Sequence, residues 1–588
     1  MPDPRVIPAQ SVAGVVTFDT LIDGTALPPE IQVLAISISK QVNRIPSAIL
    51  VIRDGEAAAE TFENSDSDLF LPGKAIEIKV GHDGSNITAF KGIIVRHAVK
   101  IKENGASSLT VECKDECVKL SLGRKNKYFS DTTDSDVLSE ILGSLAGELE
   151  SMDVSHAELV QHHVTDWDFT VMRAEANSKL VIADDGVVNI KSPRTEEAVL
   201  SVIFGSSILE FEAEMDSRHQ WQSVKTTAWN YTNQELEESE TTTADFEDLQ
   251  GNVSPATLAA ATAPDQFELR HSGQLSAAEA EAWSKAAMLK SRMAKIRGRA
   301  KFDGFGEIKP GKWLELQGVG RRFEGVAFVS AVRHEISNGA WFTHAQFGIE
   351  PEWMAAKTDV IDLEAGGLIA GVRGLQIGVA VQLENDPNGE DRILVKLPTL
   401  DNSAQGIWSR VICLDAGNER GSFFRPEIGD ELVVGFLNDD PREAVVLGHL
   451  NSAAKPAPLQ ATDDNHLKGF YTRSKMKLQF DDEKKIITIE TPGGNSLVID
   501  EDDKSITIQD QNSNKIKMGT DGIEITSPKD IKITAQGKIE AKATQDLSME
   551  GLNASLKASV SLTAEGQANA SIGSSGVTEV KGSVLKLN

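Results

Sequence analysis

The sequence has few cysteines, no stretch resembling a leader or a membrane span, and no aromatic residues near its end. Its 588 residues include three cysteines, Cys113, Cys117 and Cys413, which cannot form a disulfide framework. Met1 to Arg5 and the residues after them hold no apolar core of a secretory leader. No run approaches the ~18 uninterrupted apolar residues that a membrane helix needs. We therefore expect a protein made in the cytoplasm without a signal peptide, which leaves the cell only if other components carry it.

Basic residues are also in deficit. The chain has 59 Lys and Arg against 88 Asp and Glu, for a formal net charge of −29. A surface of this sign repels phosphate backbones and anionic lipid heads. The charge therefore excludes nucleic acid or a membrane surface as the main partner, and it helps to keep a large assembly soluble.

Aromatic residues end at Phe480, and the sequence after it also lacks cysteine and histidine. A globular core uses aromatic rings for bulk, so this tail must be built differently. Its apolar residues come in pairs separated by one residue, which indicates short strands whose paired side chains share one face. The pairs are Ile487 and Ile489, Leu497 and Ile499, Ile506 and Ile508, Ile516 and Met518, Ile523 and Ile525, Ile531 and Ile533, Ile539 and Ala541, and Leu547 and Met549.

From Ile523 onward these pairs recur every eight residues, with turn formers between them. One short strand with two inward residues cannot enclose a core, so we expect other chains to supply the remaining sides. Three copies that close a triangular prism are the simplest solution, and closure removes free strand edges. The alternative is a disordered, low-complexity tail, which the regular isoleucine pairs disfavour. The candidate core of the trimeric needle comprises Ile506, Ile508, Ile516, Met518, Ile523, Ile525, Ile531, Ile533, Ile539, Leu547 and Met549.

Residues 372–452 are predicted to form a compact barrel of the OB type. Five short strands are expected at 378–381, 392–398, 411–414, 432–436 and 444–448, with turns between them. Other barrels of this type bind single-stranded nucleic acid, but this one lacks a basic groove with interleaved aromatic residues.

The first 360 residues mix strands and helices. An amphipathic helix is expected with Leu138, Ile141, Leu142, Leu145 and Leu149 on one face. A second helix is expected to begin at Ser276, where Glu279 completes a capping box. Its apolar face would include Leu289, Met293 and Ile296, and Gly298 would end it. The acidic, Thr/Ala-rich segment 235–266 is predicted to be an exposed insertion or mobile loop.

No catalytic, cofactor or metal site is predicted. Cys113 and Cys117 have the spacing of half a zinc site, but no second cysteine pair or suitable histidine follows. His162 and His163 are adjacent, so they cannot share a helix face and are expected at the surface. The sequence also lacks the serine-hydrolase, zinc-protease and P-loop motifs.

Two ordered sets of residues form motifs, one in the barrel and one in the first 360 residues. The barrel set comprises Asp386, Pro387, Gly389, Arg392, Val395, Leu397, Pro398, Trp408, Arg410, Val411, Ala416, Gly417, Gly421, Phe423, Phe424, Pro426, Glu427, Gly429, Asp430, Glu431, Asp440, Pro441, Val446, Gly448, Leu450 and Asn451. The second set includes Phe90, Trp167, Phe169, Pro310, Gly311, Phe323, Gly325, Val332, His334, Gly339, Trp341, Phe347 and Gly348. The barrel set resembles the VgrG-type spike proteins of contractile injection systems, and the second set is similar, more weakly, to the hub region of that family.

The resemblance covers nearly the whole chain and implies a mainly β, multidomain protein. It implies a β-rich, tail-hub-like region with a few helices at 1–365, an OB-fold barrel at 366–455 and an intertwined, triple-stranded β-helix needle at 456–588. The protein would be a homotrimer that seats on a hexameric tail tube among baseplate proteins and pierces the target envelope. It would contact the target membrane only on piercing, without enzymatic activity or a cofactor.

The resemblance also implies a separate PAAR-type tip protein and, as a further candidate partner, effector cargo. The chain ends on its repeat, so a tip or toxin domain is expected on another protein. Val584, Leu585 and Leu587 would form a small apolar plateau where the tip protein docks. The spike would be made in the bacterial cytoplasm and assembled into a type VI secretion apparatus, an extracellular phage-tail-like particle or a phage. It could then be released with the particle or driven into a target.

Two other functions stay open. The first is a cell-wall hydrolase carried on a spike, but the short connection from Ser452 to Tyr471 leaves no room for an inserted lysozyme. The second is a trimeric adhesin or receptor-binding fibre, which would share a triple β-stem. A fibre of that kind would also need a terminal binding head and a secretion signal, and neither is visible in the sequence.

Overall fold

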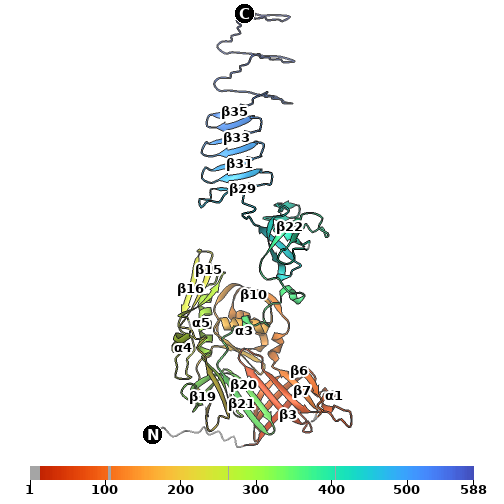
Figure 1. The fold of residues 1–588 in the computed structure, drawn as a ribbon, viewed down its shortest axis with the longest axis vertical. Coiled ribbons are helices and arrows are strands. Elements are labelled where there is room, and N and C mark those ends of the chain that lie inside the picture. Colours follow the sequence, from red (N-terminus) through yellow and green to blue (C-terminus); the bar gives the residue numbers. More distant parts are fainter. Residues whose placement is uncertain (1–13, 104–106, 263, 404, 588) are drawn as a thin grey trace. The chain divides into compact units, whose positions relative to one another are not determined.

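The computed structural model describes residues 14–103, 107–262, 264–403 and 405–587. The chain divides into two compact units, Met1–Ile428 with Val433–Gly448, and Gly429–Leu432 with His449–Asn588. Strands dominate the chain (Figure 1), which confirms the mainly β, multidomain class. The predicted absence of a leader concerns Met1 to Arg5, which lie outside the described residues.

A 13-stranded sheet is the largest element of the first unit. Its main path runs β14-β18-β21-β20-β3-β4-β7-β6-β5-β1-β2, while β19 pairs with both β20 and β13. The pairing of β3 with β20 joins segments distant in sequence and sets Ile38 opposite His334. Alternation along β3 and β4 buries Ile36, Ile38 and Leu50 in one core. The strands are β1 (Val16–Ile22), β2 (Thr25–Ala26), β3 (Val33–Gln41), β4 (Ser47–Arg53), β5 (Ala75–His82), β6 (Ser85–Lys100), β7 (Ser108–Lys114), β13 (Leu200–Ile203), β14 (Glu210–Met215), β18 (Ile296–Asp303), β19 (Trp313–Gln317), β20 (Gly325–Ser337) and β21 (Ala340–Phe347).

Helices of the first unit pack on smaller sheets. Thr133 and Thr165 cap α2 and α3 by accepting hydrogen bonds from the backbone of Asp136 and Asp168. The neighbouring elements are α2 (Asp134–Leu142), α3 (Asp166–Ala176), β8 (Lys125–Thr133), β10 (Ser155–Val164), β9 (Ala146–Leu149), β11 (Leu180–Asp184) and β12 (Val187–Lys191). A long helix, α5 (Ala277–Met293), packs on the sheet of β15 (Ser223–Asn230), β16 (Glu235–Thr241) and β17 (Gln266–His271). The shorter helices are α1 (Glu63–Asp66), α4 (Pro255–Thr262), η1 (Asp68–Phe70), η2 (Glu116–Ser121), η3 (Gly143–Leu145), η4 (Met354–Ala356) and η5 (Glu364–Gly367).

The first predicted helix is shorter than expected. Helix α2 ends at Leu142, because Gly143 adopts a left-handed φ of 53° that terminates the helix. The apolar residues that continued the helical pattern, Leu145 and Leu149, belong to η3 and β9.

The second predicted helix begins as expected, since Ser276 Oγ accepts a hydrogen bond from the Glu279 N–H at 3.1 Å. Its predicted end is wrong. The helix stops at Met293, and both Ile296 and Gly298 lie in strand β18. The apolar pattern runs on because Ile296 continues into the buried core of the large sheet.

The described residues of segment 235–266 are largely exposed, as expected, but the prediction of a loop is wrong. Strand β16 pairs with β15 from Asn230 opposite Glu235 to Val224 opposite Thr241, and α4 follows it. The segment lacks an apolar pattern because the glutamates of β16 occur on both faces of the strand and are exposed or partly exposed. The backbone carbonyl of Ser239 accepts a hydrogen bond from Ser284 Oγ of α5.

The predicted barrel is confirmed. Five strands close in the order β22-β23-β24-β28-β27, with Ala380, Val395, Val434 and Val446 buried inside. They are β22 (Gln376–Gln382), β23 (Ile393–Lys396), β24 (Ile407–Val411), β27 (Glu431–Phe436) and β28 (Ala444–His449). The strand expected at 411–414 is in fact 407–411. Between β24 and β27 lies a separate small hairpin of β25 (Ala416–Gly417) and β26 (Arg420–Gly421), and η6 (Leu437–Asp439) follows β27.

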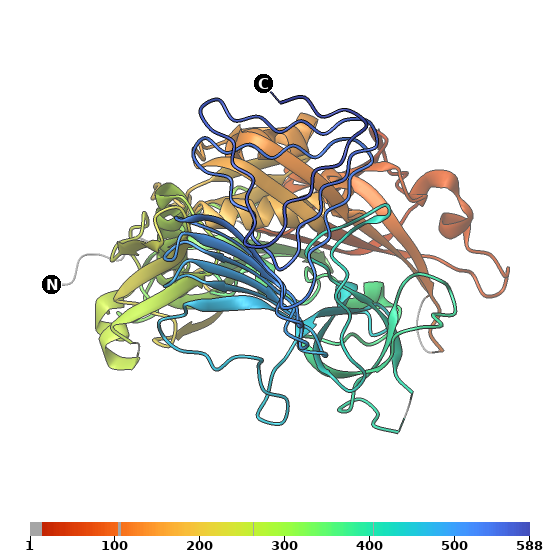
Figure 2. The same ribbon diagram turned by 90° about the horizontal axis from the view of Figure 1, so that it is seen from above.

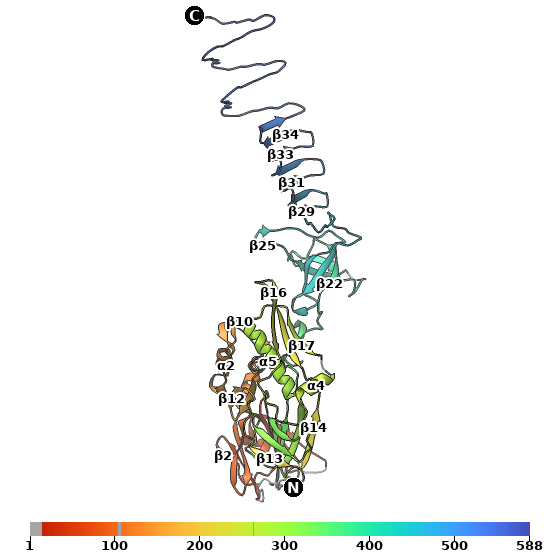
Figure 3. The same ribbon diagram turned by 90° about the vertical axis from the view of Figure 1, so that its left-hand side faces the viewer.

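The second unit contains a seven-stranded antiparallel meander, β29 to β35 in chain order. Figure 3 shows its strands stacked one after another, and Figure 2 shows them turned relative to each other, as sheet twist requires. The strands are β29 (Leu467–Tyr471), β30 (Lys477–Asp481), β31 (Ile486–Glu490), β32 (Ser496–Asp500), β33 (Ser505–Gln509), β34 (Lys515–Gly519) and β35 (Gly522–Thr526). Residues 527–587 contain no strand, although their apolar pairs continue. The repeat predicted partners from other chains, whereas strands of one chain pair with each other up to Thr526.

Within the described ranges, no helix combines the length and apolarity that a membrane crossing requires.

Candidate functional site

Two columns of apolar side chains cross the meander. In the first column, Ile489 lies opposite Leu497, Leu497 opposite Ile508, Ile508 opposite Ile516, and Ile516 opposite Ile525. The two members of each sequence pair sit two residues apart on one strand, so both columns lie on the same face. We call this face the two-column face. The second column contains Ile487, Ile499, Ile506, Met518 and Ile523.

The two-column face is open in the single chain. Ile508 and Ile516 are more than one-third exposed, and Ile523 and Ile525 more than half. A groove of about 680 Å³ is lined by side chains of the first column, from Ile489 to Ile525. Contiguous exposed apolar surface of this extent typically marks a contact with another molecule.

Six of the predicted core residues therefore come together in the two columns: Ile506, Ile508, Ile516, Met518, Ile523 and Ile525. The remaining five lie beyond β35, are more than half exposed, and belong to no strand of the single chain: Ile531, Ile533, Ile539, Leu547 and Met549. Val584, Leu585 and Leu587 are also largely exposed. The roles of all these residues in a trimer core or at a tip stay predictions.

One strand of this face, β30, was not among the predicted apolar pairs. Leu478 lies opposite Ile489, and Phe480 opposite Ile487, so β30 extends both columns by one strand. Leu478 and Phe480 show the same apolar-x-apolar spacing as the later pairs, and that signal could have identified them.

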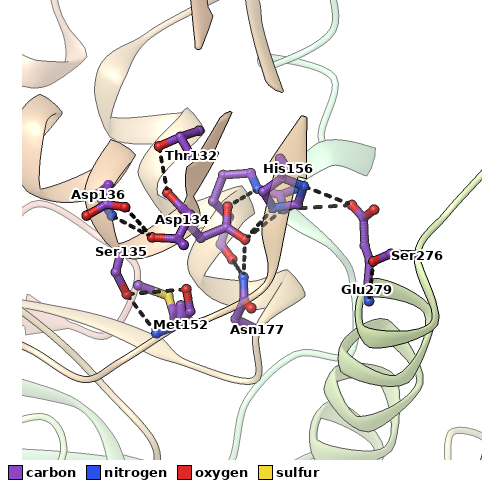
Figure 4. Close-up of polar contacts among 11 residues, drawn as sticks. Thr132, Asp134, Ser135, Asp136, Met152, His156, Asn177, Ser276 and Glu279 are labelled. Atoms are coloured by element: carbon purple, nitrogen blue, oxygen red, sulfur yellow. Dashed lines mark hydrogen bonds and ion pairs between the residues drawn. The ribbon is translucent and has the colours of Figure 1, made fainter. Parts of the chain in front are cut away.

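A buried polar cluster joins the helices of the first unit (Figure 4). Asp134, in the first turn of α2, is fully buried and accepts hydrogen bonds from Arg173 Nε at 2.6 Å and Nη2 at 2.9 Å. Asn177 Nδ2 donates to the same carboxylate at 2.8 Å, and His156 Nε2 lies 3.0 Å from it. Glu279 of α5 approaches His156 at 3.8 Å and Arg173 at 3.9 Å.

This cluster ties α2, α3 and α5 to strand β10. Burial raises the pKa of Asp134, but the hydrogen bonds from Arg173, His156 and Asn177 outweigh burial and hold the pKa below its ordinary value. Both carboxylate oxygens are engaged by donors, so neither is available as a general base. The cluster lay outside the sequence predictions because its members come from three helices and a strand far apart in sequence.

The cysteine pair does not form half of a metal site. Cys113 lies on β7 in the core of the large sheet, whereas Cys117 lies in η2 in a different core. Burial raises the pKa of the Cys113 thiol to about 12, so it stays protonated. In the part of the chain that the structure describes, no three or more metal-binding side chains gather. His162 and His163 are exposed on β10, as expected.

Three family models match the chain. The Alg8 N-terminal domain matches residues 12–338, more than half of the sequence. The type VI secretion system/phage-baseplate injector OB domain matches residues 376–450, which contain the closed barrel. The phage baseplate V C-terminal trimerisation domain matches residues 486–582, which contain most of the two-column face.

The type VI secretion system spike protein VgrG3 of Vibrio cholerae serotype O1 is 32% identical over 88 residues, 13% of this chain and 9% of that protein. Among solved structures, a prophage MuSo2 43 kDa tail protein from Shewanella oneidensis is 9% identical, with a TM-score of 0.44, over 57% of this chain and 98% of that one. A chain of the Francisella PdpA-VgrG complex is 10% identical, with a TM-score of 0.40, over 87% of this chain and 88% of that one. At such TM-scores the structural likenesses add nothing to the assignment, which rests on the matched domains. The chain belongs to the family of the Alg8 N-terminal domain and, with its baseplate OB and trimerisation domains, it is a VgrG-type spike protein of the contractile injection systems.

Proposed function

We propose that this chain is the structural spike and hub at the tip of a contractile injection machine, where it seats on the tail tube and pierces the target envelope. One observation carries the proposal: an open, two-column apolar face occupies a segment that matches a trimerisation domain. Three such faces directed at a common axis would bury one another. Each fully buried Ile or Leu side chain contributes roughly 1.5–3 kcal/mol, so closure would stabilise the needle strongly.

In this proposal the chain works as a homotrimer with three regions. Residues 1–365 form the hub, 366–455 the OB-fold collar and 456–588 the needle. The needle would resist bending under load because three chains share its core, and residues 527–587 would find in neighbouring copies the strand partners that they lack in one chain.

The proposed partners are a hexameric tail tube protein and baseplate proteins at the hub, a separate PAAR-type tip protein at the needle end, and effector cargo. The tip site is the plateau of Val584, Leu585 and Leu587, whose side chains are exposed.

The test is the mass of the purified chain by light scattering. A mass near three times 63.4 kDa is expected for the full chain, and truncation at Ser452 should weaken the association. A stable full-length monomer would contradict the proposal.

The tip site is tested separately, by co-purification with a PAAR-type protein. Changing Val584, Leu585 and Leu587 to serine should abolish capture. Changing Val577 and Val580 to serine is the matched control, since both are exposed valines of the same segment. If both variants captured the PAAR-type protein equally well, Val584, Leu585 and Leu587 would not be its docking site.

A further inference from the structure

A stretch of the barrel domain presents apolar side chains to solvent. Residues 412–428 leave the barrel after β24 and return before β27, and we call them the apolar excursion. Leu414 and Phe423 are 88% and 75% exposed, and Ile412 and Ile428 are more than half exposed. Such a concentration of exposed apolar side chains indicates a contact with another protein surface.

The apolar excursion is held in one conformation. Asp415 forms an ion pair with Arg420 at 2.8 Å, and its backbone carbonyl accepts a hydrogen bond from the Ser422 N–H at 2.9 Å. Gly421 has φ of 132°, and a Cβ there would lie 2.3 Å from the Asp415 carbonyl oxygen, so only glycine fits. A surface ordered in advance loses little conformational entropy on binding.

Arg425 fixes the far side of the same stretch. Its guanidinium donates to the Asp391 carbonyl at 3.1 Å and lies 5.3 Å from the centroid of the Phe423 ring. The ring is therefore positioned by a cation above it while most of its surface stays exposed.

The outer wall of the barrel carries an apolar shelf. On β27 the side chain of Val434 fills the barrel, so the next residue, Gly435, faces outward. Leu447 and Leu375 lie over Gly435, 3.3 and 3.5 Å from where its Cβ would be, and both are exposed. Because Gly435 has no side chain, the two leucines pack directly over its buried backbone, and together they present an exposed apolar surface.

We propose that the apolar excursion of one copy packs on the shelf of Leu375 and Leu447 of a second copy, so that the barrels add their own contact to the trimer. This inference rests on the proposed homotrimer. Excursion and shelf are different surfaces of one chain, so their contact is head-to-tail, and in the proposed homotrimer three such contacts would close a ring.

A second copy of the chain is the partner expected on the shelf, because the trimerisation domain holds the barrels of different copies close together. The trimerisation domain begins at residue 486, and only 17 residues separate β28, which ends at His449, from β29, which starts at Leu467. A fully extended segment of that length spans at most ~60 Å, so each barrel stays tethered near the others. Tethering makes even a modest contact form, because the partners meet at high effective concentration.

The test places a photo-reactive benzoylphenylalanine at position 423 of the full chain, with the same substitution at Leu400 as control. Leu400 is 71% exposed on the same barrel but lies outside the apolar excursion. Illumination should give cross-linked pairs and triples of chains from position 423, with attachment near Leu375 or Leu447, and single chains from position 400. Adding Leu447→Asp should lower the yield at 423 to the control level, whereas Leu437→Asp, at another exposed leucine, should not.

Light scattering on the same samples distinguishes failure of the barrel contact from failure of the proposed function. A trimer whose position 423 gives only single chains, or links to its own needle or to any site outside a neighbouring barrel, overturns the inference and leaves the spike standing. A wild-type monomer overturns the proposed function itself.

Discussion

Ile508 and Ile516 lie directly opposite each other on β33 and β34, yet their side chains are 47% and 38% exposed. Cross-strand pairs of large apolar residues stabilise a sheet when the face that carries them is covered. In the single chain this face is open, so the stability of the segment depends on association between copies.

We expect Ile508→Asp combined with Ile516→Asp to abolish the trimer. Each copy would bring two carboxylates into a region that excludes water, and an unpaired buried charge costs several kcal/mol. Light scattering should report the mass of one chain, while the hub and barrel remain folded by circular dichroism.

Thr507→Asp is the matched control for that variant. Thr507 lies between Ile506 and Ile508 on β33 and points to the opposite face, so its substitution should leave the mass at three chains. Dissociation by Thr507→Asp, or a trimer that tolerates both aspartates, would show that the two-column face is not the interface.

The barrel and the apolar columns were predictable because their signals are local. Alternating residues such as Val379 and Ala380 with turns between strands identify a small barrel. The pairing partner of each tail strand was not predictable, because a two-residue period identifies a face and not a neighbour. Ile516 meets Ile508 and Ile525 of its own chain, although the same pattern would serve pairing between chains equally well.

Two kinds of feature could not be predicted: where a helix ends, and which distant residues meet. Apolar residues continue the helical pattern past Leu142, but they belong to other elements, because the backbone conformation of Gly143 ends the helix. Asp134 and Arg173 stand 39 positions apart, and nothing in the sequence around either residue indicates the other.

The eight-residue period makes a prediction about length. Deleting residues 537–544 removes one full period and leaves Leu547 eight positions after Ile531, so inward residues stay inward and the trimer should form. Deleting only 537–540 shifts every later pair by half a period and should expose the apolar residues. Light scattering and thermal melting compare the two deletion variants. Equal stability of the two would contradict the prediction that the eight-residue repeat is the structural unit of the needle.

Arg173→Ala should destabilise the hub by about 3–5 kcal/mol, because it leaves the buried carboxylate of Asp134 without its cation. Arg218 provides the control. It pairs with Asp216 at 2.6 Å but its side chain is largely exposed, so Arg218→Ala should leave the free energy of unfolding almost unchanged. Denaturant unfolding of both variants measures the difference, and similar losses would show that the Asp134 cluster does not tie the helices together.

His334 is a buried histidine that stays neutral. Its Nδ1 accepts a hydrogen bond from Trp341 Nε1 at 3.3 Å and lies 3.0 Å from Thr343 Oγ1. Burial lowers the pKa of His334 to about 3, with smaller contributions from the charges of Lys40, His344 and Lys309.

Because the pKa of His334 is lowered in the folded chain, the free energy of unfolding should decrease as the pH falls below about 6.5. Below about pH 6.5 the unfolded chain binds a proton at this residue, whereas the folded chain does not until about pH 3. Over that range His334 should cost the fold up to about 1.4 kcal/mol per pH unit. His334→Gln should therefore flatten the decline of the free energy of unfolding between pH 6 and 4, while His162→Gln, at an exposed site, should leave the slope unchanged. Parallel slopes for wild type and His334→Gln would contradict this prediction, because they would mean that the imidazole takes up its proton inside the folded hub as readily as in the unfolded chain. The hydrogen bond that Nδ1 accepts from Trp341 opposes such protonation, since that nitrogen must keep its lone pair.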